Sequence, residues 1–415
     1  MSPGGAAQSR ARRSELRRRQ LRRRRATGAA LLVAVAGIGI WAAATLASGG
    51  SGSRHGATSS DSLLTVSGPD STGAPAEAST AATTSTTTTP AAVPGPSTRR
   101  VTIAWVGDTV LASKYGTPPA AGRRSMTPVV GPLRAADIAF GNLEETLSSL
   151  PDRKCGASSN CFAFQAPPSY AKLMRSAGFD VVNLANNHAD DFGAAGARST
   201  ESALRTVGVR WTGRPGQVTV VRRNGVRVAL LGFAPYKWAS RLEDIGAARA
   251  LVRVAAQKAD LVVVAIHAGA EGSTATHVPH GAETFLGENR GDSRRFAHTV
   301  IDAGADLVVG SGPHVIRGME RYHGRLIAYS TGNFAGYKNF GTAGTLSLSA
   351  ILSVQLRGDG LFAGGRWISL RLDADALPHP DPSAASARLV AQLSRQDFGA
   401  NAAHVGRDGT IRIVP

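Results

Sequence analysis

Seven short, nearly continuous apolar runs recur between residues 101 and 329, and they constrain the fold more than any other feature of this sequence. Runs of this kind are typical of strands that are buried on both faces. Segments with helical character separate them, and strands that alternate with helices indicate an α/β fold. The expected strands are Val101–Val106, Ile138–Phe140, Val181–Leu184, Val228–Phe233, Leu261–Ile266, Leu307–Val309 and Leu326–Tyr329, and the expected helices are Pro168–Ala177, Gly196–Val207, Ala247–Lys258 and Ser293–Ala303.

The C-terminal part follows a different pattern. Residues 345–355 and 367–372 alternate apolar with polar side chains, which predicts antiparallel strands with one exposed face. A Pro-rich loop at 378–382, a helix near 384–394 and a final strand at 410–414 are expected to follow. Together with the apolar runs, this pattern predicts a sandwich of mixed β-sheets flanked by helices.

The first 98 residues form three segments that cannot build a packed core. Residues 1–25 are a basic tail with ten Arg and one Glu. Residues 26–47 carry no charge and would span about 33 Å as a helix, the length of a transmembrane segment. Residues 48–98 are a low-complexity Ser/Thr/Pro tract, which predicts a disordered linker. The α/β domain is therefore expected over residues 99–415.

The basic tail also predicts the topology. Positive residues beside a transmembrane segment stay in the cytoplasm, so we expect a single-pass membrane protein with its α/β domain outside the cell. A cleaved signal peptide is the competing interpretation, because Thr45–Ala47 ends in a small residue before Ser48. The long basic tail and the long apolar segment favour an uncleaved anchor. Both interpretations export the α/β domain.

The net charge of +18 does not indicate a nucleic-acid partner. The tail supplies ten Arg minus one Glu, or +9, and the other +9 is spread over the remaining 390 residues. A nucleic-acid-binding protein concentrates its positive charge on one face, with aromatic residues among the basic ones.

The two cysteines, Cys155 and Cys161, lie in a short Gly/Ser/Asn segment. In an exported protein, such a pair predicts a small disulfide that closes a loop. A metal-binding pair is less favoured, because no further Cys or His cluster adjoins them.

Five of the expected strands are followed by side chains that can bind a metal ion. Alone, each such residue is more often a turn former, a helix cap or a hydrogen-bonded histidine. In open α/β sheets, however, ligands bind beyond the carboxyl ends of the strands, and recurrence at that edge favours a site. Carboxylate, amide and imidazole groups suit Mn²⁺, Fe²⁺ or Zn²⁺. The residues are Asp108, Asn142, Glu144, Asn186, Asn187, His188, His267 and His314.

Six motifs, in their order along the chain, resemble the capsule-synthesis CapA family, which includes proteins of poly-γ-glutamate production. The domain of that family is similar to the calcineurin-like metallophosphoesterase fold, so the resemblance implies a metallophosphoesterase-like sandwich. It covers about residues 100–340. The motifs are GDTVLA, FGNLEETL, VVNLANNHADDFG, VVVAIHAGAEG, GADLVVGSGPHVIRGME and AYSTGNF.

The resemblance also implies roles for single residues. His188 would protonate the leaving oxygen, and Asp190 would orient His188. Further residues are candidates for binding or positioning a substrate near the metal. The implied ligands of one or two divalent ions (Mn, Fe or Zn) are Asp108, Glu144, Asn187, His267 and His314, and the substrate candidates are Asn142, Glu271, His280, Arg317 and Asn333.

The sequence departs from the phosphoesterase pattern at two ligand positions. Val110 and Gly312 stand where that pattern has histidines, and Ala268 stands where family members often have Trp. Each implied ion loses one ligand. One ion, two weakly held ions, or a substitute donor are therefore all compatible with the sequence.

Two functions from different classes follow. The first is a membrane-anchored, metal-dependent hydrolase that acts in making or modifying an anionic capsule or cell-wall polymer. The second is a non-catalytic assembly factor that holds the polymer or other membrane proteins of its synthesis. A nuclease would fit the fold, but neither the expected external location nor the diffuse charge.

Overall fold

The computed structural model describes most of the chain beyond residue 97, and the described residues lie within one compact unit, Thr88–Pro415. Among these residues, no helix has the length and apolar character needed to cross a membrane. The predicted basic tail, the predicted anchor and all but the last residue of the predicted linker lie outside the described residues. The described residues are 98–112, 122, 125–151, 154–155 and 161–413.

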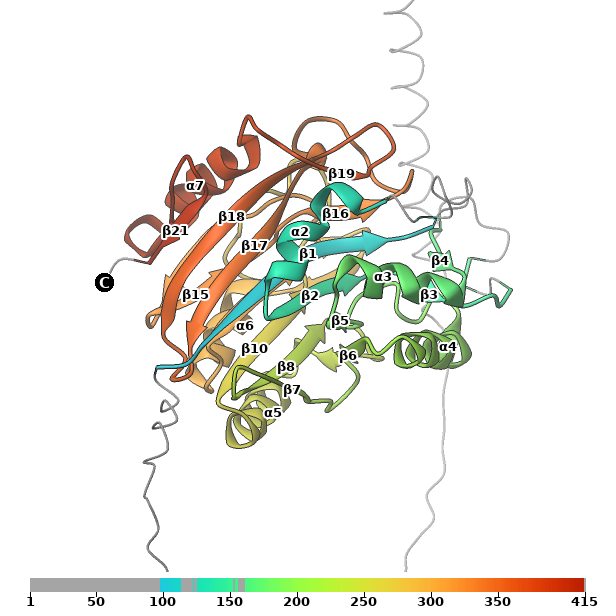
Figure 1. Cartoon of the computed structure of the whole chain (residues 1–415), viewed down its shortest axis with the longest axis horizontal. Helices are drawn as coiled ribbons and strands as arrows, with labels where there is room; N and C mark the ends of the chain where they lie inside the picture. Colours follow the sequence, from blue (N-terminus) through green and yellow to red (C-terminus); the bar gives the residue numbers. More distant parts are fainter. Residues whose placement is uncertain (1–97, 113–121, 123–124, 152–153, 156–160, 414–415) are drawn as a thin grey trace, which may run out of the picture. The chain divides into compact units, whose positions relative to one another are not determined.

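Two large mixed β-sheets form the centre of this unit (Figure 1). In the described residues, the larger sheet has the order β20-β21-β18-β17-β1-β2-β5-β6, with β16 beside β1 and β19 beside β18. Strands β1, β2, β5 and β6 run parallel, whereas β17 joins β1 in antiparallel orientation. The strands are β1 Arg100–Val110, β2 Ile138–Leu143, β5 Val181–Asn183, β6 Arg210–Thr212, β16 Asn333–Gly336, β17 Leu348–Arg357, β18 Phe362–Leu372, β19 Pro378–Pro380, β20 His404–Val405 and β21 Thr410–Arg412.

The smaller sheet has the order β14-β15-β13-β10-β8-β7, with β9 beside β8. Its central strands β8, β10 and β13 are parallel. Two short pairs, β3 with β4 and β11 with β12, lie outside both sheets. The strands are β7 Thr219–Arg223, β8 Val226–Ala234, β9 Ser240–Arg241, β10 Leu261–His267, β13 Leu307–Ser311, β14 Met319–Tyr322, β15 Arg325–Ala328, β3 Thr146–Leu147, β4 Gln165–Ala166, β11 Glu283–Phe285 and β12 Glu288–Gly291.

Helices cover the outer face of each sheet. Helices α2, α3 and α4 pack on the larger sheet, and α5 and α6 pack on the smaller one (Figure 1). Side-chain caps from Asp244 and Asp292 begin α5 and α6, and Gly178 ends α3 in the left-handed conformation. The helices are α2 Val130–Ala135, α3 Ala171–Ala177, α4 Gly193–Thr206, α5 Ile245–Lys258, α6 Ser293–Asp302 and α7 Ala385–Phe398.

The apolar runs are buried on both faces, as predicted, but one face meets the other sheet rather than a helix. In β1, Ile103 and Trp105 belong to a core shared by both sheets, whereas Ala104 and Val106 face the helices. The indole N–H of Trp105 donates to the carbonyl oxygen of Gly310 on β13, at 3.1 Å. The α/β sandwich of mixed sheets is therefore confirmed.

Several expected boundaries were wrong in detail. The strand expected at 345–355 begins at Leu348, after a 3-10 turn over Gly344–Ser347. The expected loop at 378–382 contains strand β19, which pairs with the end of β18. Strands β7, β14 and β16 were not predicted, because each is short and lacks a clear apolar run.

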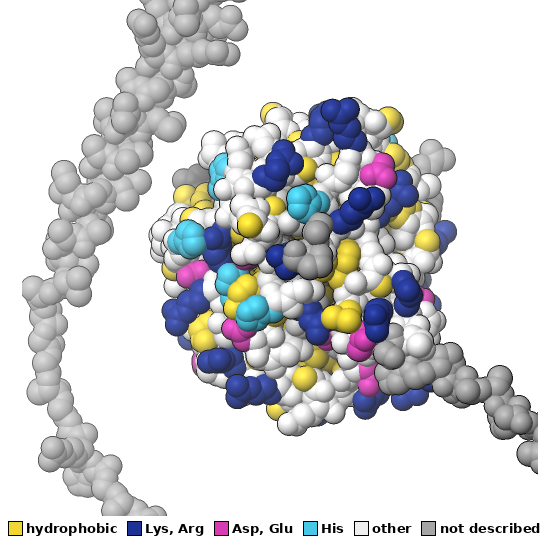
Figure 2. All heavy atoms as spheres, turned by 90° about the vertical axis from the view of Figure 1, so that its left-hand side faces the viewer, with side chains coloured by type: hydrophobic (Ala, Val, Ile, Leu, Met, Phe, Trp, Pro, Cys, Tyr) yellow, Lys and Arg dark blue, Asp and Glu magenta, His cyan; other side chains and the backbone are white. Residues whose placement is uncertain are grey.

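Basic side chains are dispersed over the surface. On the face drawn in Figure 2, Lys and Arg spread among neutral and acidic residues without forming one continuous stripe.

Close packing between β1 and the loop before β16 generates a stability prediction. A Cβ atom at Gly107 would lie 1.9 Å from the carbonyl oxygen of Gly332. We expect Gly107→Ala to destabilise the protein by about 2 kcal/mol, a fall of several degrees in Tm, because this backbone contact cannot relax. At Gly246 in α5, a Cβ would meet only an ordinary contact at 3.6 Å, so Gly246→Ala should leave Tm unchanged or raise it. Equal melting temperatures for the two variants would contradict this account.

Candidate metal centre

Asp108 lies at an irregularity within β1. The strand continues to Val110, so Asp108 does not end it as predicted, but the register with β2 shifts between Val106 and Asp108. Such bulges re-aim side chains next to functional sites. The carboxylate is fully buried, and its Oδ1 accepts from Asn142 Nδ2 at 2.8 Å, while its Oδ2 accepts from the backbone N–H of Gly312 at 3.2 Å.

A cluster of ligand-type atoms from both sheets surrounds this carboxylate. One ligand atom each from Asp108, Glu144 and His314 lies within 4.8 Å of the others. His267 contacts the same group, with its Nδ1 3.5 Å from Asp108 Oδ1 and its Nε2 3.6 Å from Glu144 Oε1. The structure therefore brings together four of the five predicted metal ligands.

Unpaired polar atoms show what this cluster lacks. Among the described residues, neither carboxylate oxygen of Glu144 has a hydrogen-bond donor, and His267 Nε2 is also without a partner, although all three atoms are buried. A buried carboxylate without a partner is strongly unfavourable, and a cation in contact with it removes the penalty. The donor set of carboxylates and imidazoles fits a divalent ion such as Mn²⁺, Fe²⁺ or Zn²⁺.

Neighbouring side chains orient the two histidines. Nδ1 of His267 lies 3.2 Å from both Asn142 Nδ2 and Ser311 Oγ, which leaves Nε2 directed at Glu144. Nδ1 of His314 lies 2.8 Å from Asn333 Oδ1, as well as 3.1 Å from Asp108 Oδ2. Such outer contacts fix the ring orientation of metal-binding histidines.

His314 has an unusual backbone conformation, with φ of +61°. A non-glycine residue in the left-handed region carries strain, and such residues cluster at functional sites. Here the conformation turns the chain back after β13 and directs the imidazole toward Glu144, 3.8 Å from Nε2 to Oε1.

The proton affinities in the cluster are strongly shifted. Burial opposes ionisation of Asp108, yet hydrogen bonds with His267 and His314 hold its pKa well below the usual range. Burial and the charge of Asp108 raise the pKa of Glu144. Burial lowers the pKa of His267. Burial would also lower the pKa of His314, but the nearby carboxylates raise it to about 10. Burial and the neighbouring carboxylates therefore favour the protonated forms of Glu144 and His314.

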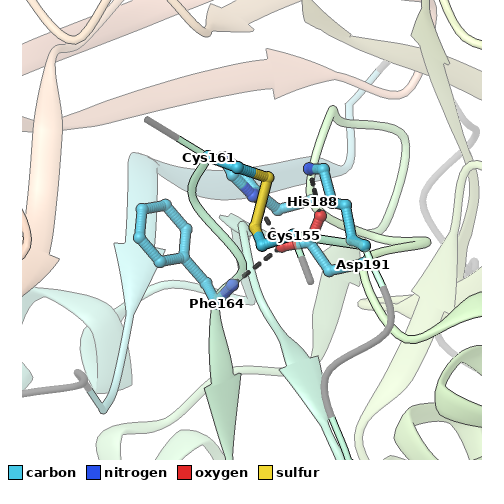
Figure 3. Close-up of a disulfide and its surroundings, with 6 residues drawn as sticks. Cys155, Cys161, Phe164, His188 and Asp191 are labelled. Atoms are coloured by element: carbon cyan, nitrogen blue, oxygen red, sulfur yellow. Dashed lines mark hydrogen bonds and ion pairs between the residues drawn. A yellow bond between two sulfur atoms is a disulfide. The ribbon is translucent and has the colours of Figure 1, made fainter. Parts of the chain in front are cut away.

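His188 stands at the side of this cluster, and its partner differs from the predicted one. Its Nδ1 lies 2.7 Å from Oδ2 of Asp191, so the prediction that Asp190 orients His188 was wrong (Figure 3). Asp190 is half-buried and faces a second cavity with Lys237 and Trp238. The two aspartates are adjacent in sequence, and only the turn after β5 decides which of them faces the histidine.

Three buried asparagines, Asn142, Asn183 and Asn186, form a hydrogen-bond network behind the metal ligands. Asn142 is central, because its Oδ1 accepts from Asn183 Nδ2 at 2.9 Å and from Asn186 Nδ2 at 3.2 Å while its own Nδ2 reaches Asp108. Asn142 is thus a support for the ligands rather than a substrate contact. Sequence analysis did not single out Asn183, although its place at the end of a buried strand was an available signal.

Asn187 lines the second cavity, with Lys154 and Asp191, rather than the space above Glu144. Its Oδ1 is nevertheless a buried atom without a hydrogen-bond partner among the described residues. Its role as a ligand of a second ion stays a prediction.

Glu271 offers a further carboxylate next to the four clustered ligand residues. Its Oε1 accepts from the buried Arg290 at 2.6 Å, and its Oε2 lies 3.6 Å from His314 Nε2. At the two positions that depart from the phosphoesterase pattern, Val110 is buried and apolar, and Gly312 packs against His267. Glu271 is therefore positioned to offer a carboxylate oxygen beside His314, where the pattern's histidine ligands are replaced.

Two predicted substrate residues lie elsewhere. Arg317 is buried and its Nη atoms form a two-point pair with Glu283 at 2.7 Å, while its Nε donates to a backbone carbonyl. It is thus engaged in holding β11 and is not available to a phosphate. His280 is exposed and faces Arg294 on α6. The pairing of Arg317 with Glu283 argues against its predicted substrate contact, and substrate contact by His280 stays a prediction.

A cavity of about 230 Å³ opens above the cluster. His188, Glu271, His314 and Asn333 contribute to its wall, and contact of Asn333 with a substrate stays a prediction. The remainder of the wall is largely aromatic, and no Lys or Arg is among its described lining residues. The aromatic members are Phe162, Phe164, Phe285 and Phe340.

The predicted disulfide is present between Cys155 and Cys161, whose Cα atoms are 5.3 Å apart. Figure 3 shows it beside Phe164, His188 and Asp191. A disulfide that sequence analysis treated only as a loop closure therefore lies next to the site.

Comparison with known sequences gives one family. The model of the family "Bacterial capsule synthesis protein PGA_cap" matches residues 102–338, more than half of the chain. The sequence is 29% identical to the capsule biosynthesis protein CapA of Bacillus anthracis, over 57% of this chain and 59% of that protein. It is also 29% identical to the PGA biosynthesis protein CapA of Bacillus subtilis, over 48% of this chain and 53% of that protein. The chain thus spans little more than half the length of these relatives.

Solved structures with a related arrangement include two nucleotidases. The 5'-nucleotidase precursor from Thermus thermophilus superposes with a TM-score of 0.40 and 12% identity, over 68% of this chain and 56% of that one. A putative 5'-nucleotidase from Staphylococcus aureus gives 0.39 and 13%, over 71% and 58%. Similarity at this level does not bear on activity.

Two neighbouring glutamates provide a matched test of the metal site. Glu144 and Glu145 are both fully buried, but Glu145 faces away and accepts the backbone N–H of Leu111 at 2.8 Å. Burial raises the pKa of Glu145 to about 8, so glutamine resembles its neutral form. We expect Glu144→Gln to lose bound Mn, Fe or Zn and Glu145→Gln to retain it, measured by mass spectrometry on the full-length chain. Equal metal content in the two variants would reject the cluster as the site.

Metal affinity should also depend on pH. Glu144 and His314 both have raised pKa values, and each must release its proton to coordinate an ion. The Kd for Mn²⁺ should therefore fall between pH 6 and pH 8, by about tenfold per pH unit for each proton released. Titration calorimetry in two buffers of different ionisation enthalpy measures both the affinity and the protons. Affinity that is independent of pH would mean that these two groups are not ligands.

Proposed function

Because the chain belongs to the PGA_cap family of bacterial capsule synthesis proteins, we propose that it acts in making or modifying a capsule or cell-wall polymer through a metal-dependent hydrolytic site. The observation that carries the proposal is the Glu144 carboxylate between His267 and His314, which has no hydrogen-bond donor among the described residues and lies beneath a cavity that His188 also lines. This arrangement fits a cation, and the proposed proton donor stands next to it.

The residues divide the chemistry between them. Asp108, Glu144, His267 and His314 would hold the ion, with Glu271 nearby as a further carboxylate. When bound, such an ion polarises a phosphoryl or acyl oxygen and lowers the pKa of water. Asn142 and Asn333 fix the ligands, and the aromatic walls exclude bulk water from the reacting group.

His188 is the proposed proton donor. Its Nδ1 is bound to Asp191, which leaves Nε2 as the nitrogen that can deliver a proton to a leaving oxygen. Burial lowers the pKa of His188, although Asp191 opposes that shift. His188 must take up a proton at Nε2, as the imidazolium, before it can donate one, and the Asp191 carboxylate stabilises that charged form.

The location and the polymer are part of the same proposal. We place the α/β domain outside the cell, anchored by residues 26–47, with a surface polymer or its precursor as substrate and other membrane proteins of polymer synthesis as partners. The disulfide supports an oxidising compartment. The family match and the name of the Bacillus anthracis relative support a capsule pathway.

A non-catalytic scaffold is the second candidate. Val110 and Gly312 favour it, because each occupies a position where the phosphoesterase pattern has a histidine. In that case, the ion would stabilise the fold and the cavity would bind a polymer segment without turnover.

Replacement of His188 separates the two candidates. We expect His188→Ala to lower kcat for an alkyl phosphodiester, whose leaving alkoxide needs a proton, by about 10²-fold or more, with metal content unchanged, because only the proton donor is lost. The matched control is His379→Ala, a change at an exposed histidine that contacts Asp373. Stoichiometric metal in the wild-type chain without turnover of phosphodiesters, phosphomonoesters or peptides would favour the scaffold.

A further inference from the structure

The disulfide-bridged segment between β3 and β4 ends against the proposed proton donor. Cys155 and Cys161 close this segment, and Figure 3 shows the bridge beside Phe164, His188 and Asp191. Lys154 precedes the first cysteine, and Phe164 follows the second by three residues. The bridge therefore controls how far these two residues can move apart.

Both residues bind the same carboxylate. Oδ2 of Asp191 accepts the backbone N–H of Phe164 at 2.7 Å, in addition to its contact with His188. Oδ1 of Asp191 pairs with Nζ of Lys154. The Asp191 side chain is fully buried, so its position depends on these partners rather than on solvent.

The ring of Phe164 also packs on the imidazole. The two ring centroids are 4.2 Å apart, at an interplanar angle of 37°. His188 is therefore held at Nδ1 by Asp191 and on its face by Phe164. Among the described residues, the same short segment fixes both contacts.

We propose that Lys154 and Phe164 are positioning residues that act on His188 through Asp191, and that the Cys155–Cys161 disulfide is required to keep them in place. The inference rests on the proposed role of His188 as proton donor. A segment without the bridge would sample many more conformations, and the pair that clamps Asp191 would form only part of the time. Two-electron reduction by a dithiol, which converts the bridge to two thiols, would loosen the clamp without touching the metal ligands.

The chemical reason lies in the geometry of proton transfer. A donor must stand within hydrogen-bond reach of the leaving oxygen, and a displacement of about 1 Å costs on the order of 10²-fold in rate. If Asp191 rotated away, Nδ1 of His188 would lose its partner, and either ring nitrogen could then carry the proton of the neutral imidazole. The clamp therefore fixes the position of His188 and keeps one proton on Nδ1, so that the second proton of the imidazolium lies on Nε2.

The experiment uses the full-length chain with four variants. Cys155→Ser with Cys161→Ser removes the bridge, Lys154→Met removes the ion pair, and Lys154→Arg restores a cation. Lys237→Met is the control. Lys237 lines the same second cavity as Lys154 and Asp191 but is not among the described partners of Asp191. Melting temperature and metal content are measured for every variant, which identifies any chain that fails to fold.

The first readout does not need turnover. In ¹H NMR of histidine-labelled protein, the Nδ1–H of His188 bound to Asp191 should give a downfield resonance, assigned by its loss in His188→Gln. We expect the resonance to broaden or disappear in the double Cys variant and in Lys154→Met, and to persist in Lys154→Arg and Lys237→Met. A resonance unchanged in the double Cys variant and in Lys154→Met would overturn the proposal.

The second readout uses the same alkyl phosphodiester. The double Cys variant and Lys154→Met should lose about tenfold or more in kcat with KM within about twofold, and Lys154→Arg should recover most of the loss. If the wild-type chain shows no turnover, the proposed function fails while the NMR result still decides the clamp. Full kcat in the variants without the bridge or without the cation would overturn the positioning role.

Discussion

The bond from the Trp105 indole to the Gly310 carbonyl crosses an apolar seam between two sheets that face each other. The seam stays apolar until β1 and β10 reach Asp108 and His267, where the two sheets deliver a carboxylate and an imidazole to the same point. A strand advances about 3.3 Å per residue, so a slip of one residue in either sheet would separate these groups. The packing of the two sheets therefore determines the geometry of the metal centre.

The charges of the metal centre account for several features that would otherwise be unfavourable. Two fully buried carboxylates, Asp108 and Glu144, stand beside histidines, and the oxygens of Glu144 have no donor among the described residues. His314 holds a left-handed backbone conformation to face them. Arrangements of this kind persist where a surrounding scaffold enforces them, and a bound cation would convert the same residues from a liability into a source of stability.

The sequence was informative wherever position along a strand decided the outcome. Asp108, Glu144, His267 and His314 lie near the ends of apolar runs, and the parallel strands of each sheet bring such residues to the end where the two sheets meet. The sequence was uninformative where the conformation of a turn decides which side chain faces the site. Asp190 and Asp191 are neighbours, and composition does not tell which one faces His188. Arg317 looked like a phosphate ligand because its partner Glu283 lies 34 residues upstream, beyond the reach of a local pattern.

The loss of two histidine positions, which favours a scaffold, is offset in part by Glu271. Val110 and Gly312 remove donors, but Glu271 brings a carboxylate to within 3.6 Å of His314 Nε2, held in place by the buried Arg290. A structural ion would need only the cluster, with no buried histidine–aspartate pair beside an open cavity. His188 and Asp191 have no evident part in holding that cluster, yet Phe164 and the disulfide segment fix them beside it. Such support for a residue outside the ligand set is expected of a proton donor.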